Sequence, residues 1–225
     1  ELDALVHAIT ELRSGRLPDL RVHRRSVRHK PDLSVLLLMD LSASTNAATP
    51  AAEESTLLSL IRKASLLLGL AISQTGDPFA IHGFRSNGRH EVDYLRFKEF
   101  SGPMDEAVLE KLSGMTGALS TRMGAAIRHA SHQMRNCRTV QRLILLLTDG
   151  EPHDIDVFDS SYLTLDAARA VKCSSAEGTP VFCVSVDPLA DPYLQKIFGM
   201  HHYQIIDRIE QLPQRLPELY LRLTA

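Results

Sequence analysis

The stretch LSVLLLMDLSAS, from Leu33 to Ser44, joins an apolar run to a carboxylate and two hydroxyls. An unbroken apolar run of strand length is typical of a central parallel strand that is covered on both faces. Asp40, Ser42 and Ser44 then fall on the turn that leaves this strand. The stretch therefore predicts an α/β protein with polar side chains at the carboxyl end of a buried strand.

Two further segments carry oxygen donors in similar positions. The apolar run 143–147 is followed by Thr148-Asp149-Gly150, and Thr121 lies on a loop that opens a helix. Because ligands of parallel sheets bind at the carboxyl ends of the strands, we expect Asp149 and Thr121 to approach Asp40. Carboxylates and hydroxyls suit a hard divalent cation such as Mg2+, or Mn2+ or Ca2+, better than zinc or copper.

Strand and helix patterns alternate along most of the chain. Apolar periodicity predicts helices near 2–13, 56–74, 105–112, 122–134, 163–177 and 209–223, and strands near 33–39, 79–84, 91–97, 143–147, 180–186 and 203–206. The fold class indicated is a doubly wound, mostly parallel sheet with helices on both faces. Pro213 and Pro217 favour a break in the last helix. We assign residues 1–30 to an N-terminal helix and basic arm, and 31–225 to the domain itself.

Composition excludes several classes of partner. Lys plus Arg number 25 and Asp plus Glu 27, a formal net charge of -2, so no global field attracts nucleic acid or an anionic membrane. Three scattered cysteines indicate free thiols and a reducing cytoplasm. The apolar stretch 57–72 contains Arg62 and Lys63 and is expected to be too short to span a bilayer. We recognise no secretory leader, and because the chain begins at Glu1, we expect a piece of a longer protein.

Each oxygen-bearing fragment alone has an ordinary interpretation, because Asp and Ser after a strand more often cap the next helix. The three fragments together resemble the metal-ion-dependent adhesion site of the von Willebrand factor A family. That resemblance implies a first loop with Asp40, Ser42 and Ser44, a second with Thr121 and a third with Asp149. In this family one coordination position is left for water or for a partner's carboxylate.

Longer stretches resemble the C-terminal domain of the CbbO and NorD proteins. They are 76–84, 119–130 and 197–199, while 94–98 and 150–156 look more like CbbO. The resemblance implies a non-enzymatic adaptor that works with a hexameric MoxR-type AAA+ ATPase of the CbbQ kind. Its client would be Rubisco, held through a surface Asp or Glu. The alternative is a NorD-type adaptor for maturation of nitric oxide reductase.

The chain lacks a Walker A loop, GxxxxGK[ST], so the motor must lie elsewhere. Arg122, His153 and Asp154 adjoin the expected metal loops, and we assign them to a partner-binding rim. For Arg122 an ordinary surface position at a helix start is an equal alternative. The acidic loop with Asp154, Asp156 and Asp159 is interpreted as a solvated rim rather than a second cation site.

Catalytic alternatives rank lower. An aspartyl-phosphate enzyme normally needs a carboxylate two residues after the nucleophile, where this chain has Ser42. Water activated by a bound cation would allow a Mg2+-dependent phosphatase or hydrolase, but no well-placed base is evident beyond His153. The GxSxG and GxGxxG motifs are absent. The pairs His129/His132 and His201/His202 lack companion ligands for zinc.

Overall fold

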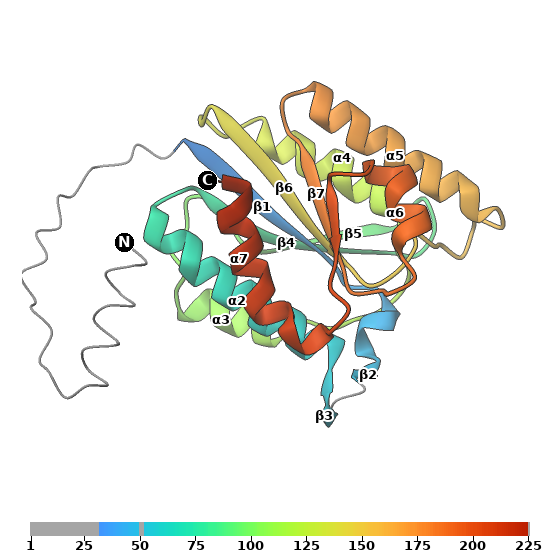
Figure 1. Cartoon of the computed structure of the whole chain (residues 1–225), viewed down its shortest axis with the longest axis horizontal. Helices are drawn as coiled ribbons and strands as arrows, with labels where there is room; N and C mark the ends of the chain where they lie inside the picture. The colour runs from blue at the N-terminus through green and yellow to red at the C-terminus, as the bar shows by residue number, and fades with distance from the viewer. Residues whose placement is uncertain (1–31, 50–51, 225) are drawn as a thin grey trace, which may run out of the picture. The chain divides into compact units, whose positions relative to one another are not determined.

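The computed structural model describes residues 32–49 and 52–224, and a six-stranded sheet forms the centre of this part of the chain (Figure 1). The strand order is β5-β4-β1-β6-β7-β8. All neighbouring strands are parallel except β5, which forms an antiparallel hairpin with β4. The strands are β1 (Leu33–Asp40), β4 (Phe79–Ser86), β5 (Val92–Lys98), β6 (Gln141–Thr148), β7 (Val181–Ser185) and β8 (Tyr203–Ile205). The predicted doubly wound α/β fold is confirmed.

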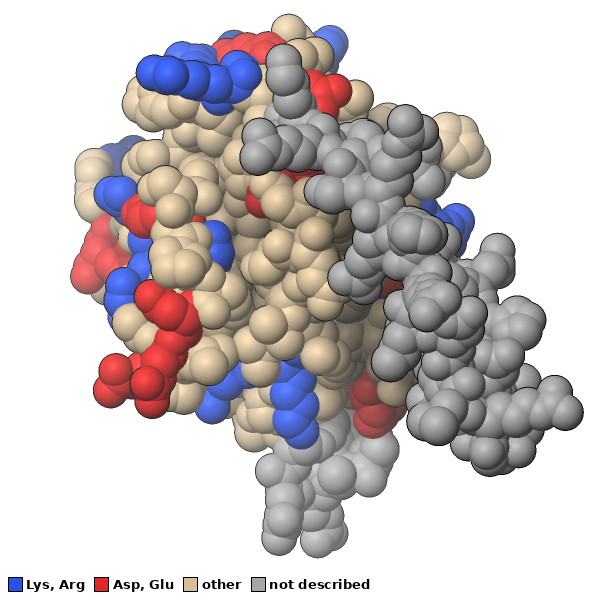
Figure 2. Space-filling view, turned by 90° about the vertical axis from the view of Figure 1, so that its left-hand side faces the viewer, with Lys and Arg blue, Asp and Glu red and all other residues tan. Residues whose placement is uncertain are grey.

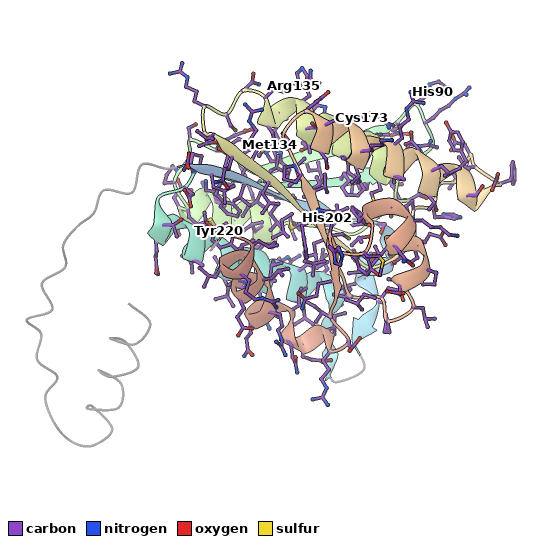
Figure 3. The ribbon with its side chains drawn as sticks, turned by 45° about the horizontal axis from the view of Figure 1, so that its top comes forward. His90, Met134, Arg135, Cys173, His202 and Tyr220 are labelled. Atoms are coloured by element: carbon purple, nitrogen blue, oxygen red, sulfur yellow. The ribbon has the colours of Figure 1, made fainter. Side chains whose placement is uncertain are left out.

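Helices cover both faces of the sheet (Figure 1). One layer consists of α2 (Leu57–Thr75), α3 (Glu106–Ser113) and α7 (Leu212–Thr224). The other consists of α4 (Met123–Met134), α5 (Ser160–Ala176) and α6 (Asp191–Phe198). Figure 3 labels one buried residue from each layer, Met134 of α4 and Tyr220 of α7, on opposite sides of the sheet. Each layer encloses its own apolar core.

Side chains of β1 alternate between these two cores. Val35, Leu37 and Met39 pack against the α2 layer, whereas Leu36 and Leu38 pack against the α4 layer. All five are fully buried, and each such side chain contributes about 1.5–3 kcal/mol through its removal from water. Because this packing fixes the register of β1, it also fixes where Asp40 leaves the sheet.

The apolar helix α2 is a core helix. Thr56 caps its first turn by accepting a hydrogen bond from the Ser59 amide, and Gly76 ends it in the left-handed conformation. Within the described part of the chain, this is the one helix whose length and composition would allow it to cross a membrane, and half of its most apolar window is buried. The expectation that this apolar stretch is too short to span a bilayer is wrong by length, since the helix has 19 residues, but its burial agrees with a place in the core.

Three local features differ from the sequence predictions. The sequence patterns did not predict helix α6 or the elements of segment 43–56. These elements are the 3-10 turn η1 (Ala43–Asn46) and a small hairpin of β2 (Ala48–Thr49) and β3 (Ala52–Thr56). The expected break at Pro213 or Pro217 is absent, since a 3-10 turn, η2 (Ile209–Gln211), leads into one helix. Pro213 lies in its first turn, where no amide donor is needed, and buried leucines hold the helix against α2.

The predicted helix near 2–13 and the basic arm up to residue 30 lie outside the described residues, so the boundary at residue 31 stays a prediction. Free cysteines are confirmed: Cys183 is buried, Cys137 half-buried and Cys173 exposed. On the face drawn in Figure 2, basic and acidic side chains are interspersed around a broad uncharged area. That distribution agrees with the near-zero net charge.

We predict that His82, which is fully buried on β4, stays neutral well into the acidic range. Burial lowers its pKa from 6.5 to about 4, and its Nδ1 lies 2.9 Å from the Tyr94 hydroxyl. Because the unfolded chain takes up this proton near pH 6.5, His82 reduces stability progressively as pH falls from 6.5 to 4. NMR of the imidazole carbons, assigned with His82→Gln, should show no titration above pH 5; a midpoint near 6.5 would contradict the buried, neutral state.

Candidate metal centre

Asp40 is the centre of the site. It is the last residue of β1 and is 1 % exposed. Its carboxylate accepts hydrogen bonds from the Ser42 amide at 2.9 Å and the Thr148 hydroxyl at 2.8 Å. The Thr121 hydroxyl lies 3.2 Å from both carboxylate oxygens. The first and second predicted metal loops therefore meet at one buried carboxylate.

The two serines lie on a firmly held turn. Ser42 Oγ and Ser44 Oγ are 3.0 Å apart, and the carbonyl of Ser42 accepts a 2.7 Å hydrogen bond from Thr45 Oγ1. A Cβ at Gly117 would lie 2.2 Å from Thr45 Oγ1, so only glycine lets the second loop pass this close. The Asn46 side chain also donates to the Gly117 carbonyl at 2.7 Å. The turn is thus fixed from its far side by the loop before Thr121.

Asp149 completes the group from the end of β6. Its charge acts on Asp40 and the Ser44 hydroxyl favours its ionised form, so the third loop lies beside the first. Its Oδ1 atom is buried and has no hydrogen-bond partner in the described part of the protein. A buried carboxylate oxygen without a partner is costly, and here it lies beside a second carboxylate. The structure thus brings together all five residues predicted as ligands.

Both carboxylates resist ionisation when no cation is present. Burial, and then the charge of Asp149, raise the pKa of Asp40 from 3.8 to about 6. Burial also raises the pKa of Asp149, and Asp187 adds to that rise, while the Ser44 hydrogen bond opposes it. A bound cation would reverse this balance, because it favours the ionised form of both groups.

The donor set fits a hard cation. Two carboxylates and three hydroxyls are oxygen ligands of the kind that Mg2+, Mn2+ and Ca2+ accept. Within residues 32–49 and 52–224, no cluster of three or more His, Cys, Asp and Glu side chains could hold a metal, so a cation at this edge would need the hydroxyls as ligands. His129 instead packs against Tyr94 in a tilted arrangement, with ring centroids 4.2 Å apart and an interplanar angle of 54°, and the zinc alternative gains no support.

Two residues at the site were missed by sequence reasoning. Thr148 was noted only as part of the third segment, yet its hydroxyl is a direct partner of Asp40. Asp187 follows β7, and its charge raises the pKa of Asp149. Its carboxylate accepts hydrogen bonds from the Leu189 amide at 2.9 Å and the Tyr193 hydroxyl at 3.1 Å. The available signal was its position just beyond a buried strand, at the same edge of the sheet.

The predicted rim needs correction at two of its three residues. Arg122 and Asp154 are 7 % and 1 % exposed, and they form an ion pair with Nε and Oδ2 2.8 Å apart. Burial alone would raise the pKa of Asp154, but hydrogen bonds, above all from the Gly88 amide and the Ser86 hydroxyl, hold it below its usual range. A solvated rim position is therefore wrong for this pair, because both side chains serve internal contacts.

His153 does lie at the surface, and its backbone forms two hydrogen bonds with Thr121. The acidic loop does not gather around a second cation either. Asp156 contacts Arg122 and accepts from the Arg89 amide, whereas Asp159 caps α5 through Ser161. In Figure 3, His90 marks the β4–β5 turn at the end of the molecule where α5 begins, which is where these contacts gather.

These features define a von Willebrand factor type A domain, and the model of that family matches residues 34–219, so the chain belongs to it. Among curated proteins, it is 32 % identical to protein NorD of Stutzerimonas stutzeri over 94 % of this chain and 34 % of that protein. It is 36 % identical to an uncharacterized protein of Pseudomonas aeruginosa, over 99 % of this chain and 36 % of that protein. The chain thus spans about a third of the length of these relatives.

Among solved structures, the minor pilin PilB of Streptococcus sanguinis superposes with a TM-score of 0.68. The match covers 88 % of this chain and 62 % of the pilin at 12 % identity, so it concerns the fold alone.

We predict that Asp40→Asn abolishes metal binding without harming the fold. The amide removes one charge from the buried pair, so in EDTA the variant should be as stable as the wild type or more stable. Mg2+ should raise the unfolding midpoint of the wild type and leave that of Asp40→Asn unchanged. Differential scanning calorimetry of both proteins, with Mg2+ and with EDTA, measures this; an equal Mg2+ shift in the variant would exclude Asp40 as a ligand.

Arg122→Ala should be strongly destabilising, by about 3 kcal/mol or more, because it leaves the buried Asp154 carboxylate without its cation. Urea unfolding of Arg128→Ala provides the control, since Arg128 forms a half-exposed ion pair with Asp166. That change should cost about 1 kcal/mol or less. Similar losses in the two variants would show that the Arg122 pair is no more important than a surface contact.

Proposed function

We propose that this domain is a non-enzymatic adaptor that binds a divalent cation, Mg2+ or else Mn2+ or Ca2+, and through it a carboxylate of a client protein. The observation that carries the proposal is the partnerless, buried Oδ1 of Asp149 beside the buried carboxylate of Asp40. Asp40, Ser42, Ser44, Thr121 and Asp149 would hold the cation. A cation supplies the positive charge to which an incoming carboxylate binds.

The surrounding residues favour binding over turnover. The groups that contact Asp40 are hydroxyls and a backbone amide, none of which is a general base at neutral pH. Position 42 carries a serine, so the second carboxylate of an aspartyl-phosphate enzyme is missing. His153 is held at the site by its backbone while its side chain is exposed. Binding a partner's carboxylate requires neither a general base nor a second carboxylate at position 42.

Our proposal for the ATPase partner and the client protein is supported by resemblance to relatives. Resemblance to CbbO and NorD proteins supports a hexameric MoxR-type ATPase as the partner that supplies work, in the cytoplasm. The stretches 94–98 and 150–156 favour a CbbO-type role with Rubisco as client. The name NorD of a curated relative favours nitric oxide reductase instead. The site serves either client equally well, because both roles need only a surface Asp or Glu.

The test is capture of each purified client by the tagged chain, with chemical crosslinking, in Mg2+ and in EDTA. We expect Rubisco or nitric oxide reductase to be retained in Mg2+ and lost in EDTA and in Asp40→Asn. Asp32→Asn is the matched control, because Asp32 is exposed at the opposite end of β1 and should leave capture unchanged.

Capture that persists in EDTA would contradict a metal-mediated grip. If neither client is retained although the chain binds Mg2+, both client assignments fail. Rapid hydrolysis of a phosphate ester in Mg2+, lost in Asp40→Asn, would replace the adaptor by the phosphatase alternative.

A further inference from the structure

Three loops at the edge of the sheet that carries the metal centre expose large apolar side chains. Leu119 precedes Thr121, Ile155 and Phe158 lie between β6 and α5, and Leu189 follows β7. Their exposed fractions are 41 %, 64 %, 104 % and 82 % respectively. We call these four residues the apolar collar. Figure 1 shows β1, β6 and β7 ending at the same edge, where these loops begin or end.

Contacts of the described residues place Leu119, Ile155 and Leu189 beside the metal loops, and Phe158 lies further along the loop that carries Ile155. The Leu119 carbonyl accepts a 3.0 Å hydrogen bond from the Ala43 amide, between Ser42 and Ser44. Ile155 follows the segment whose His153 pairs with the Thr121 backbone. The Leu189 amide donates to Asp187, which follows β7, the neighbour of the strand that leads to Asp149. Each ligand loop therefore has an exposed apolar neighbour.

The backbone of Leu119 is the most informative feature of the collar. Its φ of 65° lies in the left-handed region, and among the described residues it is the one position of this kind that is not glycine. A side chain with a Cβ disfavours this conformation. Hydrogen bonds on either side, Ala118 to Leu41 and Ser120 to Ser86, hold it in place. Because 41 % of the Leu119 side chain is exposed, packing offsets the strain only in part, and a role in binding would account for keeping leucine at this position.

We propose that the collar and the metal centre together form one docking surface for a protein segment that carries a single Asp or Glu flanked by apolar residues. This inference rests on the proposed function. Apolar contacts around a charged contact exclude water from it, which strengthens the attraction between cation and carboxylate. The same contacts add affinity through burial of the collar itself.

Charge around the site favours one carboxylate over an acidic run. Asp187 follows β7, the neighbour of the strand that leads to Asp149, and its carboxylate is held there by the Leu189 amide at 2.9 Å, while Asp159 is exposed at the start of α5. Additional acidic side chains in a partner would meet these carboxylates and be repelled. Apolar flanking residues avoid that repulsion and match the collar.

Two dye-labelled peptides test the proposal by fluorescence polarisation with the chain in excess Mg2+. One is acetyl-Ala-Leu-Glu-Phe-Ala-amide and the other acetyl-Ala-Ser-Glu-Ser-Ala-amide. The apolar peptide should bind about tenfold more tightly, the ratio expected when part of one or two apolar side chains is buried. Binding of both should be lost in EDTA and in Asp40→Asn.

Collar variants separate binding from stability. Leu119→Gly suits the left-handed backbone, so its unfolding midpoint should equal or exceed that of the wild type while the advantage of the apolar peptide falls several-fold. Phe158→Ser should reduce the affinity of the apolar peptide in the same way. Val140→Ser is the matched control, since Val140 is 85 % exposed just before β6, at the opposite edge of the sheet. It should change neither peptide's affinity.

Equal affinity of the two peptides in Mg2+ would contradict a role of the apolar collar in binding, but it would leave carboxylate binding at the metal centre unaffected. If neither peptide binds although Mg2+ is bound, both carboxylate binding at the metal centre and the docking role of the apolar collar are contradicted. Full binding of the apolar peptide to Asp40→Asn would show an apolar contact independent of the metal and would overturn the joint surface.

Discussion

Two carboxylates placed at the ends of adjacent parallel strands are the constraint on which the site depends. β1 and β6 pair in a register that sets Met39 opposite Leu147, so Asp40 and the Thr148-Asp149 turn leave the sheet together. Burial opposes ionisation of both groups, and so does a neighbouring charge, that of Asp149 for Asp40 and that of Asp187 for Asp149. The fold maintains this unfavourable arrangement through two apolar cores, which bury β1 completely on either side.

The loops around these carboxylates are held by contacts that do not involve a cation. Gly117 permits close approach of the first and second loops, and the backbone of Thr121 pairs with that of His153. The buried pair of Arg122 and Asp154 then fixes the second loop to the third, with Ser86 as a further partner. Ligands that are positioned in advance need little rearrangement when a cation or a partner binds, as an adaptor requires.

The sequence was sufficient to predict the structure wherever one physical signal dominated. Continuous apolar strands predicted the sheet, and the polar residues that follow two of them, with Thr121 on a separate loop, gave five candidate ligands that the structure places at one edge. Their role as metal ligands stays a prediction. Prediction from the sequence failed for polar residues whose burial depends on partners that are distant in the chain. Arg122 and Asp154 look like surface residues in the sequence, yet each is buried because the other neutralises it.

Other features depended on backbone geometry that residue types do not encode. Asp187 matters only because β7 lies next to β6, and the left-handed backbone of Leu119 follows from hydrogen bonds to segments far away in the chain. Helix α6 is short, and its Pro192 near the start and Gly199 at its end are weak signals when taken alone.

The most direct test of the account is a crystal structure of the chain grown with Mn2+ and measured at the manganese absorption edge. The account predicts one anomalous peak between Asp40 and Asp149, within bonding distance of the hydroxyls of Ser42, Ser44 and Thr121. No peak at this edge of the sheet, or a peak held instead by Asp156 and Asp159, would contradict it.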